Sequence, residues 1–382
     1  METRKLYYED AHLRFFSATV TGCEPASVGY YVNLDATAFY PEGGGEACDL
    51  GTLGGVNVLD VREVDGVIRH LCDGPLAVGA VVTGEIDWAR RFDLMQQHTG
   101  EHIVSGLLHA KFGYMNTGFH VGHDVMEVDF DGPVSPEDLA EIERKANEAI
   151  WADIPLECWI PGQEELKSVV YRTKRALPWP VRIVRVPGYD SCACCGVHVK
   201  RTGEVGLIKI LSCTALRGGV RLEIVCGIRA YRYMAKIFEE NRQVSQIFSA
   251  PMDATAQAAR RASEALATEK ARATALENRI LDTVAETYVN HRDVVHFEPN
   301  LNNTALRGLA ERIAGVCGGR TAVFSGNNGA FSYCLAQPGG DLRELNKALC
   351  TALDGRGGGK PEYQQGTLRA TEADIRRFFK EQ

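Results

Sequence analysis

The chain has 382 residues, of which 45% are hydrophobic and 24% charged, the proportions of an ordinary globular protein of two to four domains. Its formal net charge of -8 argues against strong non-specific nucleic-acid binding, which requires neutralisation of phosphates, but allows a local basic face. No stretch approaches the roughly 18 uncharged apolar residues of a membrane span, and residues 1–10 lack the apolar run of a signal peptide. We therefore expect a cytoplasmic protein with no membrane partner.

Residues 1–90 consist of short strand-like runs separated by Gly and Asp. One such run ends near Val20, and another covers residues 79–88. Many short strands with turn signals between them predict a small β-barrel as the first domain.

Residues 91–227 mix helical and strand-like segments. Apolar residues recur at helical spacing over 92–108, which predicts a helix there. A strand is expected over 126–131 and a second helix over 136–150, which Ser135 is placed to cap. This pattern predicts a mixed α/β domain.

Two histidines of the first predicted helix, His98 and His102, are four residues apart. Their imidazoles lie on one helical face, one turn apart, and can bind the same ion. A second short pair, Cys194 and His198, lies in a glycine-bounded turn between two strand-like runs. Thiolate and imidazole are ligands that zinc prefers, so the four residues together predict one zinc site.

A long helical arm is predicted over 228–292. Its first helix begins near Ile228 and is interrupted by Pro251. A second helix, from Asp253 to about Asn290, is rich in Ala, Glu, Arg and Lys and has apolar residues in a heptad-like register. Two roles remain open, a homodimer contact and an amphipathic hairpin with no part in assembly.

Residues 293–382 return to an α/β pattern. Strands are expected over 320–325 and 331–336, and a helix over 342–353. Three glycines then precede Lys360, which predicts an anion nest whose backbone amides approach a phosphate beside a cation. A Walker loop is excluded, because a proline follows that lysine in place of the hydroxyl residue.

Four segments in a fixed order carry a family likeness. Residues 34–51 contain the run Tyr-Pro-Glu-Gly-Gly-Gly-Glu, residues 95–102 and 190–206 contain the two ligand pairs, and residues 356–361 read Arg-Gly-Gly-Gly-Lys-Pro. They resemble the glycine-rich loop, the two zinc motifs and the DHH-associated C-terminal signature of the long form of the AlaX family. These free-standing alanyl-tRNA editing proteins are similar to the editing and C-terminal domains of alanyl-tRNA synthetase.

The resemblance implies an α+β protein with four parts. These are a translation-factor-like β-barrel over 1–90, a zinc-dependent editing domain over 91–227, the helical arm over 228–292, and a DHH-associated domain over 293–382 for tRNA binding or dimerisation. It also implies a zinc-dependent trans-editing hydrolase that deacylates tRNA(Ala) mischarged with Ser or Gly. The candidate tRNA contacts are Arg217, Arg221, Arg356 and Lys360.

The polar candidates for catalysis or substrate positioning are Thr37, Glu46 and Glu101. The family usually has Gln where this chain has Glu46, and Gly-Gly-Thr where residues 195–197 are Cys-Gly-Val. Neither change removes a ligand, but the preference between serine and glycine stays open. Cys192 and Cys195, which flank the expected ligand Cys194, are candidate competing or redox-sensitive thiols.

Alternative functions fit the same residues. One is a non-catalytic RNA-binding protein stabilised by zinc, since four protein ligands are the usual set of a structural zinc site. The other is a zinc hydrolase that edits a different aminoacyl-tRNA. A metalloprotease of the H-E-x-x-H type is excluded, because Thr99 follows the first histidine.

Overall fold

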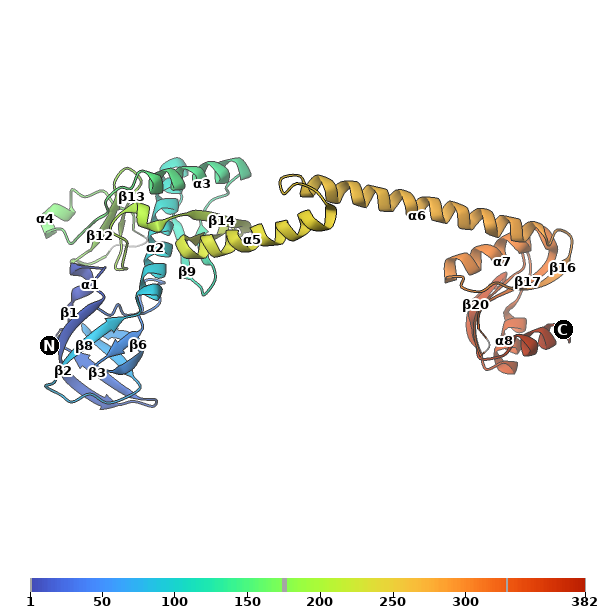
Figure 1. Cartoon of the computed structure of the whole chain (residues 1–382), viewed down its shortest axis with the longest axis horizontal. Helices are drawn as coiled ribbons and strands as arrows, with labels where there is room; N and C mark the ends of the chain where they lie inside the picture. The colour runs from blue at the N-terminus through green and yellow to red at the C-terminus, as the bar shows by residue number, and fades with distance from the viewer. Residues whose placement is uncertain (1, 174–176, 328, 382) are drawn as a thin grey trace. The chain divides into compact units, whose positions relative to one another are not determined.

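The computed structural model of the protein describes residues 2–173, 177–327 and 329–381. The chain divides into two compact units, Met1–Arg242 and Gln243–Gln382 (Figure 1). Both units combine helices with β-sheets, so the fold is mixed α/β.

Six antiparallel strands of the first unit close into a small barrel. In barrel order they are β2 (Phe15–Pro25), β3 (Tyr30–Leu34), β7 (Val67–Cys72), β6 (Val56–Val64), β5 (Gly51–Leu53) and β8 (Val81–Ile86). Fully buried Val32, Leu53, Val61 and Ile68 fill its interior. The remaining elements of this part are the parallel pair β1 (Arg4–Lys5) and β4 (Ala36–Thr37) and the one-turn helix α1 (Leu6–Glu9).

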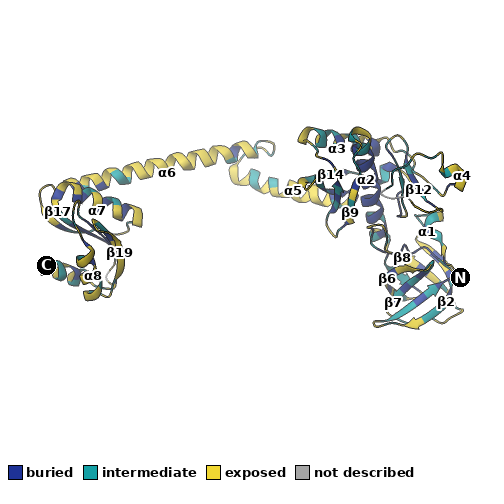
Figure 2. Cartoon of the chain, turned by 180° about the vertical axis from the view of Figure 1, so that it is seen from behind, coloured by how far each residue is buried: buried dark blue, intermediate teal, exposed yellow. Residues whose placement is uncertain are grey.

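The long helix α2 (Trp88–Phe112) runs through the core of the first unit and carries the histidine pair. It begins at Asp87, whose side chain accepts a hydrogen bond from the Arg90 amide, and ends at Gly113 in the left-handed conformation. Every residue from 94 to 106 is buried, as the dark blue of α2 in Figure 2 shows. The predicted helix over 92–108 is therefore confirmed and extends further at both ends.

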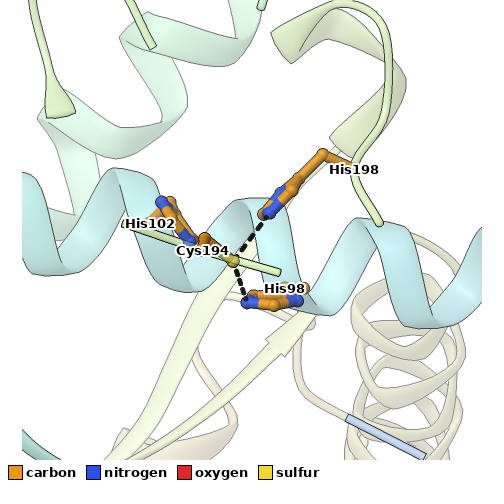
Figure 3. Close-up of side chains that lie close together, drawn as sticks. All are labelled: His98, His102, Cys194 and His198. Atoms are coloured by element: carbon orange, nitrogen blue, oxygen red, sulfur yellow. Dashed lines mark hydrogen bonds between the residues drawn. The ribbon is translucent and has the colours of Figure 1, made fainter. Parts of the chain in front are cut away.

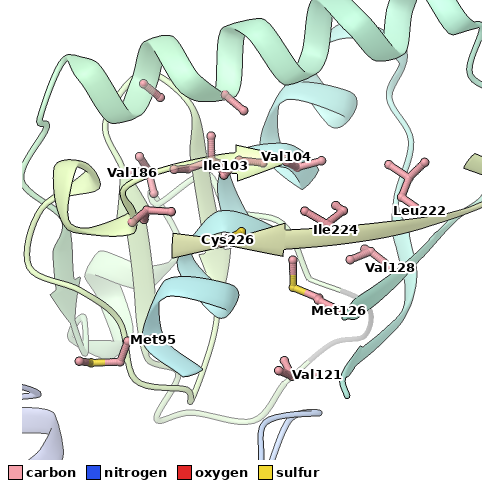
Figure 4. Packing of buried hydrophobic residues seen from close by; sticks show 14 of the residues in the cluster. Met95, Ile103, Val104, Val121, Met126, Val128, Val186, Leu222, Ile224 and Cys226 are labelled. Atoms are coloured by element: carbon pink, nitrogen blue, oxygen red, sulfur yellow. The ribbon is translucent and has the colours of Figure 1, made fainter. Parts of the chain in front are cut away.

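Two sheets surround this helix. One has the order β14 (Ile208–Leu216), β15 (Gly219–Cys226), β10 (Met126–Phe130) and β9 (Asn116–Val121). The other has the order β11 (Glu157–Trp159), β12 (Ile183–Val186) and β13 (Asp190–Ala193). Figure 4 shows Ile103 and Val104 of α2 within one apolar cluster with Leu222 and Ile224 of β15. This packing holds α2 between the strands and the loop that follows β13.

Two further predicted elements of the first unit are confirmed. The strand expected over 126–131 is β10, and the helix expected over 136–150 is α3 (Pro136–Trp151). Ser135 caps α3, with its hydroxyl 3.1 Å from the Asp138 amide. The first unit also contains the one-turn helix α4 (Gln163–Leu166) and the 3-10 turn η1 (Thr202–Val205).

Two helices occupy the segment predicted as an arm. The first, α5 (Gly227–Phe248), ends before Pro251, as the sequence indicates. The second, α6 (Thr255–Glu286), starts two residues later than expected and is exposed along most of its length, yellow in Figure 2. No helix of the described residues is long and apolar enough to cross a membrane.

The second unit has one five-stranded sheet. Its order is β16 (Arg292–Phe297), β17 (Gly318–Asn327), β18 (Ala330–Ala336), β20 (Tyr363–Leu368) and β19 (Arg356–Lys360). Helices α7 (Asn303–Cys317), α8 (Arg343–Ala352) and α9 (Glu372–Lys380) pack on it in two apolar layers. The two strands and the helix predicted between 320 and 353 correspond to β17, β18 and α8.

The predicted anion nest at the glycine run is wrong. Residues 357–359 belong to β19, an edge strand that pairs antiparallel with β20. A nest requires alternating right- and left-handed backbone, and none of these three glycines has a positive φ. Glycine is needed there for close packing, because a Cβ on Gly357 would lie 2.1 Å from the hydroxyl oxygen of Tyr333.

Candidate metal centre

The four residues of the two short motifs lie together in the first unit. His98 and His102 project from one face of α2, and Cys194 and His198 come from the loop after β13 (Figure 3). Their ligand atoms all lie within 4.8 Å of one another. Cys194 Sγ is 3.4 Å from His98 Nε2 and also 3.4 Å from His198 Nε2. The structure thus forms a group that can hold a metal ion.

The loop that carries Cys194 is fixed by backbone contacts. The Arg182 guanidinium donates to the carbonyl oxygens of Cys194 and Gly196, at 3.0 and 2.8 Å. The Gly196 amide donates to Cys194 Sγ at 3.3 Å. A Cβ on Gly196 would lie 2.2 Å from the His98 ring, so only glycine fits there. The loop therefore brings the cysteine and the last histidine against α2.

Each histidine is oriented by a second side chain at its outer nitrogen. The Nδ1 partners are Glu46 Oε2 for His98 at 2.7 Å, Asp190 Oδ2 for His102 at 2.9 Å, and Thr99 Oγ1 for His198 at 3.1 Å. A carboxylate can only accept, so Nδ1 of His98 and of His102 donates the proton. This arrangement leaves Nε2 of each ring directed toward the cysteine sulfur, the orientation that a metal ligand requires.

The cluster has the electrostatics of a ligand set that competes with protons for a cation. Burial opposes ionisation of Cys194, but the neighbouring histidines lower the pKa of its thiol well below the usual range. Burial likewise opposes protonation of His102, whereas the Cys194 thiolate and Asp190 raise its pKa to about 9. Metal ligands bind in their deprotonated forms, so the lowered pKa of the Cys194 thiol favours the form that binds a metal.

Of the three polar candidates, Glu46 contacts the cluster directly. Its Oε2 accepts from His98 Nδ1 and, at 3.3 Å, from the Val197 amide. Its Oε1 is buried and has no hydrogen-bond partner among the described residues. Burial raises the pKa of this carboxyl, while His98 opposes the shift.

The other two candidates lie in different surroundings. Glu101 Oε2 is 4.0 Å from His102 Nε2, and Glu101 Oε1 accepts from Ser105 and Asn116. Thr37 instead belongs to a hydrogen-bonded pair with His70, at 2.9 Å from its Nε2, and none of its hydrogen bonds reaches the metal ligands. The structure therefore brings Glu46 and Glu101, but not Thr37, into contact with the cluster.

Two cysteines flank the candidate ligand Cys194. Cys195 is exposed and lies 4.0 Å from the Tyr40 hydroxyl, and Cys192 is half-buried. Burial raises the pKa of both thiols, so neither is primed as a reactive thiolate. Cys192 also lies near His102 and Asp190, but both Asp190 oxygens already accept bonds from Arg172.

The four candidate tRNA contacts lie on two separate elements. Arg217 is exposed in the turn between β14 and β15, and Arg221 in β15 is paired with Asp129 at 2.7 Å. Arg356 and Lys360 stand exposed at the two ends of β19 in the second unit. Of these four side chains, Arg221 is thus engaged by a carboxylate.

The residues missed at the sequence level are the partners Thr99 and Asp190. Thr99 directly follows the first histidine, and Asp190 precedes the ligand cysteine by four residues. A metal-bound histidine almost always donates its second nitrogen to a carboxylate, a backbone carbonyl or water. That rule, together with the position of Asp190 within the second motif, indicates Asp190 as a partner of one of the histidines.

Comparison with known proteins gives three kinds of match. Residues 181–222, which include Cys194 and His198, match the model of the threonyl and alanyl tRNA synthetase second additional domain. The alanine–tRNA ligase of Thermofilum pendens is 31% identical over 97% of this chain and 43% of its own length. The alanyl-tRNA editing protein Aarsd1 of Danio rerio is 27% identical over 97% of this chain and 96% of its own length.

Among solved structures, the C-Ala domain of the Aquifex aeolicus alanyl-tRNA synthetase matches 23% of this chain and 87% of that domain. Its TM-score is 0.21 and its sequence identity 18%. The chain spans less than half of the Thermofilum ligase, whereas it spans nearly all of Aarsd1. The chain is thus homologous both to the alanyl-tRNA synthetases and to the free-standing alanyl-tRNA editing protein.

Proposed function

We propose that the protein is a zinc-dependent trans-editing hydrolase. It would cleave the ester between a wrongly attached serine, or glycine, and the 3′ end of tRNA(Ala). The observation that carries this proposal is the buried cluster of His98, His102, Cys194 and His198, with an outer partner on every histidine, in a chain homologous to an editing protein along its whole length.

The donor set and its spacing fit a zinc ion. Zinc binds thiolate sulfur at about 2.3 Å and imidazole nitrogen at about 2.0–2.1 Å, so a tetrahedral site separates S from N by about 3.5 Å. The observed separations of Cys194 Sγ from two histidine nitrogens are both 3.4 Å. When bound, the ion supplies Lewis-acid polarisation of an ester carbonyl and activation of water.

The chain's own side chains would orient the reaction. Glu46 and Asp190 hold His98 and His102 by their outer nitrogens, and Glu101 lies 4.0 Å from His102 Nε2. Cys194 is the only one of the four candidate ligands that is not fully buried, so substrate would approach from its side. Because the aminoacyl ester is already activated, positioning and charge stabilisation supply most of the required catalysis.

Discrimination of serine from alanine would depend on a hydrogen bond to the serine hydroxyl. A site built for such a bond rejects the analogue without the hydroxyl far more strongly than an apolar pocket does. Glu46 Oε1 is a buried acceptor with no partner among the described residues. Glutamine, the usual residue of the family, has both donor and acceptor atoms, whereas ionised glutamate has acceptors only.

Binding of the tRNA body would come from the second unit. The exposed Arg356 and Lys360 are the proposed phosphate contacts there, with Arg217 on the β14–β15 turn in the first unit. A second copy of the chain is the proposed partner of α6, on which Leu266, Leu276 and Ile280 are 57%, 47% and 62% exposed. Burial of this apolar row would stabilise a homodimer.

The deciding experiment is deacylation of Ser-tRNA(Ala), Gly-tRNA(Ala) and Ala-tRNA(Ala) by the purified full chain. The proposal predicts hydrolysis of the serine ester, survival of the alanine ester, and loss of activity with a zinc chelator. Tight binding of tRNA with no hydrolysis of any of the three would support the alternative of a non-catalytic zinc protein. Equal rates on all three esters would refute selective editing.

A further inference from the structure

A cavity of about 360 Å³ lies behind the metal cluster in the first unit. It is lined by the C-terminal part of α2, at Gly106 and His109, by Arg172 and by residues 189–191. Asp190 borders this cavity and also holds His102 at Nδ1. The cavity is therefore one side chain away from a candidate metal ligand, on the Nδ1 side of His102.

Two hydrogen-bonding side chains line the cavity. Arg172 is held in place by Asp190, with Nε 2.6 Å from Oδ1 and Nη2 2.9 Å from Oδ2, and its side chain is only 9% exposed. The hydroxyl of Ser191 is buried and lacks a partner in the described part of the chain. A buried hydroxyl without a partner is costly, so this wall can accommodate a further hydrogen bond.

The charges that line the cavity favour an anion. Arg185 supplies a second guanidinium, which is 37% exposed, pairs with the exposed Glu157 at 3.2 Å and lies over the Trp159 ring at 4.8 Å from its centroid. Among the described lining residues Asp190 is the one carboxylate, and its oxygens are committed to Arg172 and His102. Planar guanidinium groups bind phosphate by two parallel hydrogen bonds, so a phosphate group suits these donors.

The size and the remaining lining indicate more than inorganic phosphate. A volume of 360 Å³ falls in the range of about 300–1,000 Å³ that is typical of small-molecule sites. Tyr171 and Tyr189 also border the cavity and offer aromatic surface on which a base can stack. We propose that this cavity binds a nucleoside monophosphate unit, either a free nucleotide or one nucleotide of an RNA strand.

Occupancy of this site would be coupled to the metal centre. Asp190 Oδ2 lies 2.9 Å from both Arg172 Nη2 and His102 Nδ1, so the two donors share one oxygen. A phosphate that draws Arg172 toward itself leaves more of the carboxylate charge for His102 and raises the basicity of that ligand. Metal and nucleotide therefore bind with positive coupling, and each strengthens the other by the same factor.

The binding test uses the full-length, zinc-loaded protein and isothermal titration with adenosine 5′-monophosphate. We expect binding, and an affinity at least tenfold lower for adenosine and for inorganic phosphate. Arg185→Ala and Ser191→Ala each lower the affinity at least fivefold, while zinc content stays unchanged. Arg201→Ala is the matched control, since Arg201 is a half-exposed arginine of the same unit that pairs with Asp153 outside this cavity.

A short single-stranded RNA ending in CCA distinguishes the two sources of the nucleotide. Tighter binding of the RNA than of the mononucleotide assigns the site to an RNA strand, and the reverse order assigns it to a free nucleotide. The coupling is measured as a severalfold fall in the zinc Kd when the nucleotide is present. Equal mononucleotide affinity in Arg185→Ala, Ser191→Ala and Arg201→Ala would overturn the proposal. These binding measurements are independent of deacylation, so their failure leaves the proposed hydrolase unaffected.

Discussion

Replacement of Glu46 by Gln tests how the buried carboxylate acts on the metal centre. The variant keeps the size of the side chain but converts the bond from His98 Nδ1, now 2.7 Å long and charge-assisted, into a neutral one. A hydrogen bond to a charged group contributes about 1.5–3 kcal/mol, and a neutral one about 1 kcal/mol. The difference of roughly 0.5–2 kcal/mol corresponds to an increase in the zinc Kd of about 2- to 30-fold.

The assay is competition for zinc with a chromophoric chelator at fixed pH. Glu42→Gln is the matched control, because Glu42 lies in the same segment, is 47% exposed and pairs with Arg62 away from the cluster. We expect the control to keep the wild-type Kd and Glu46→Gln to retain zinc at stoichiometric load while its serine-to-glycine deacylation ratio changes. A zinc Kd within twofold of the control, together with an unchanged ratio, would remove Glu46 from the site.

Three further outcomes follow from groups outside the cluster. Burial lowers the pKa of His70 to about 4, below its unfolded value of about 6.5. Between these two pH values the unfolded chain binds one more proton than the folded chain. The free energy of unfolding therefore falls by about 3 kcal/mol between pH 6.5 and 4. Arg91→Leu leaves the buried carboxylate of Asp49 unpaired and costs about 3–5 kcal/mol in denaturant unfolding. The double variant Arg356→Ala/Lys360→Ala raises the KM for aminoacyl-tRNA and reduces the salt dependence of binding by about one unit of slope per lost phosphate contact.

Each of these outcomes has a control within the chain. His70→Gln should flatten the acid limb of the stability curve, and an unchanged limb would contradict the assignment to His70. Arg90→Leu changes the neighbouring, half-exposed arginine and should cost far less than Arg91→Leu, so equal costs would show that the buried pair is not special. Arg343→Ala, in the same unit and paired with Asp341, should leave the KM and the salt slope unchanged.

The two short pairs of candidate ligands were predictable from the sequence because their signals are local. Spacing of four on a helix and of four across a turn fixes which side chains share a face, whatever the rest of the chain does. Helix ends were predictable for the same reason, as Ser135 and Pro251 act on their immediate neighbours. Which histidine each orienting carboxylate contacts was not predictable, since Glu46 and Asp190 reach their histidines across 52 and 88 residues of sequence.

Contacts between residues far apart in the sequence also explain why the expectations for the glycine run of β19 and for Thr37 differ from the structure. The sequence predicts an anion nest at the three glycines of β19. Their backbone instead pairs with β20, and Gly357 packs against Tyr333. Thr37 lies close in sequence to the glycine-rich loop, yet its hydroxyl is bonded to His70. Sequence proximity to a motif therefore did not indicate which direction a side chain faces.

The most direct test of the account is zinc content and Ser-tRNA(Ala) deacylation measured on the same preparations of wild type, His102→Ala and Cys194→Ala. His123→Ala serves as the control, because His123 is 97% exposed and away from the cluster. The account predicts one zinc per chain and hydrolysis for the wild type and the control, and loss of both in the two ligand variants. Full zinc content in both ligand variants, or undiminished hydrolysis by metal-free protein, would contradict it.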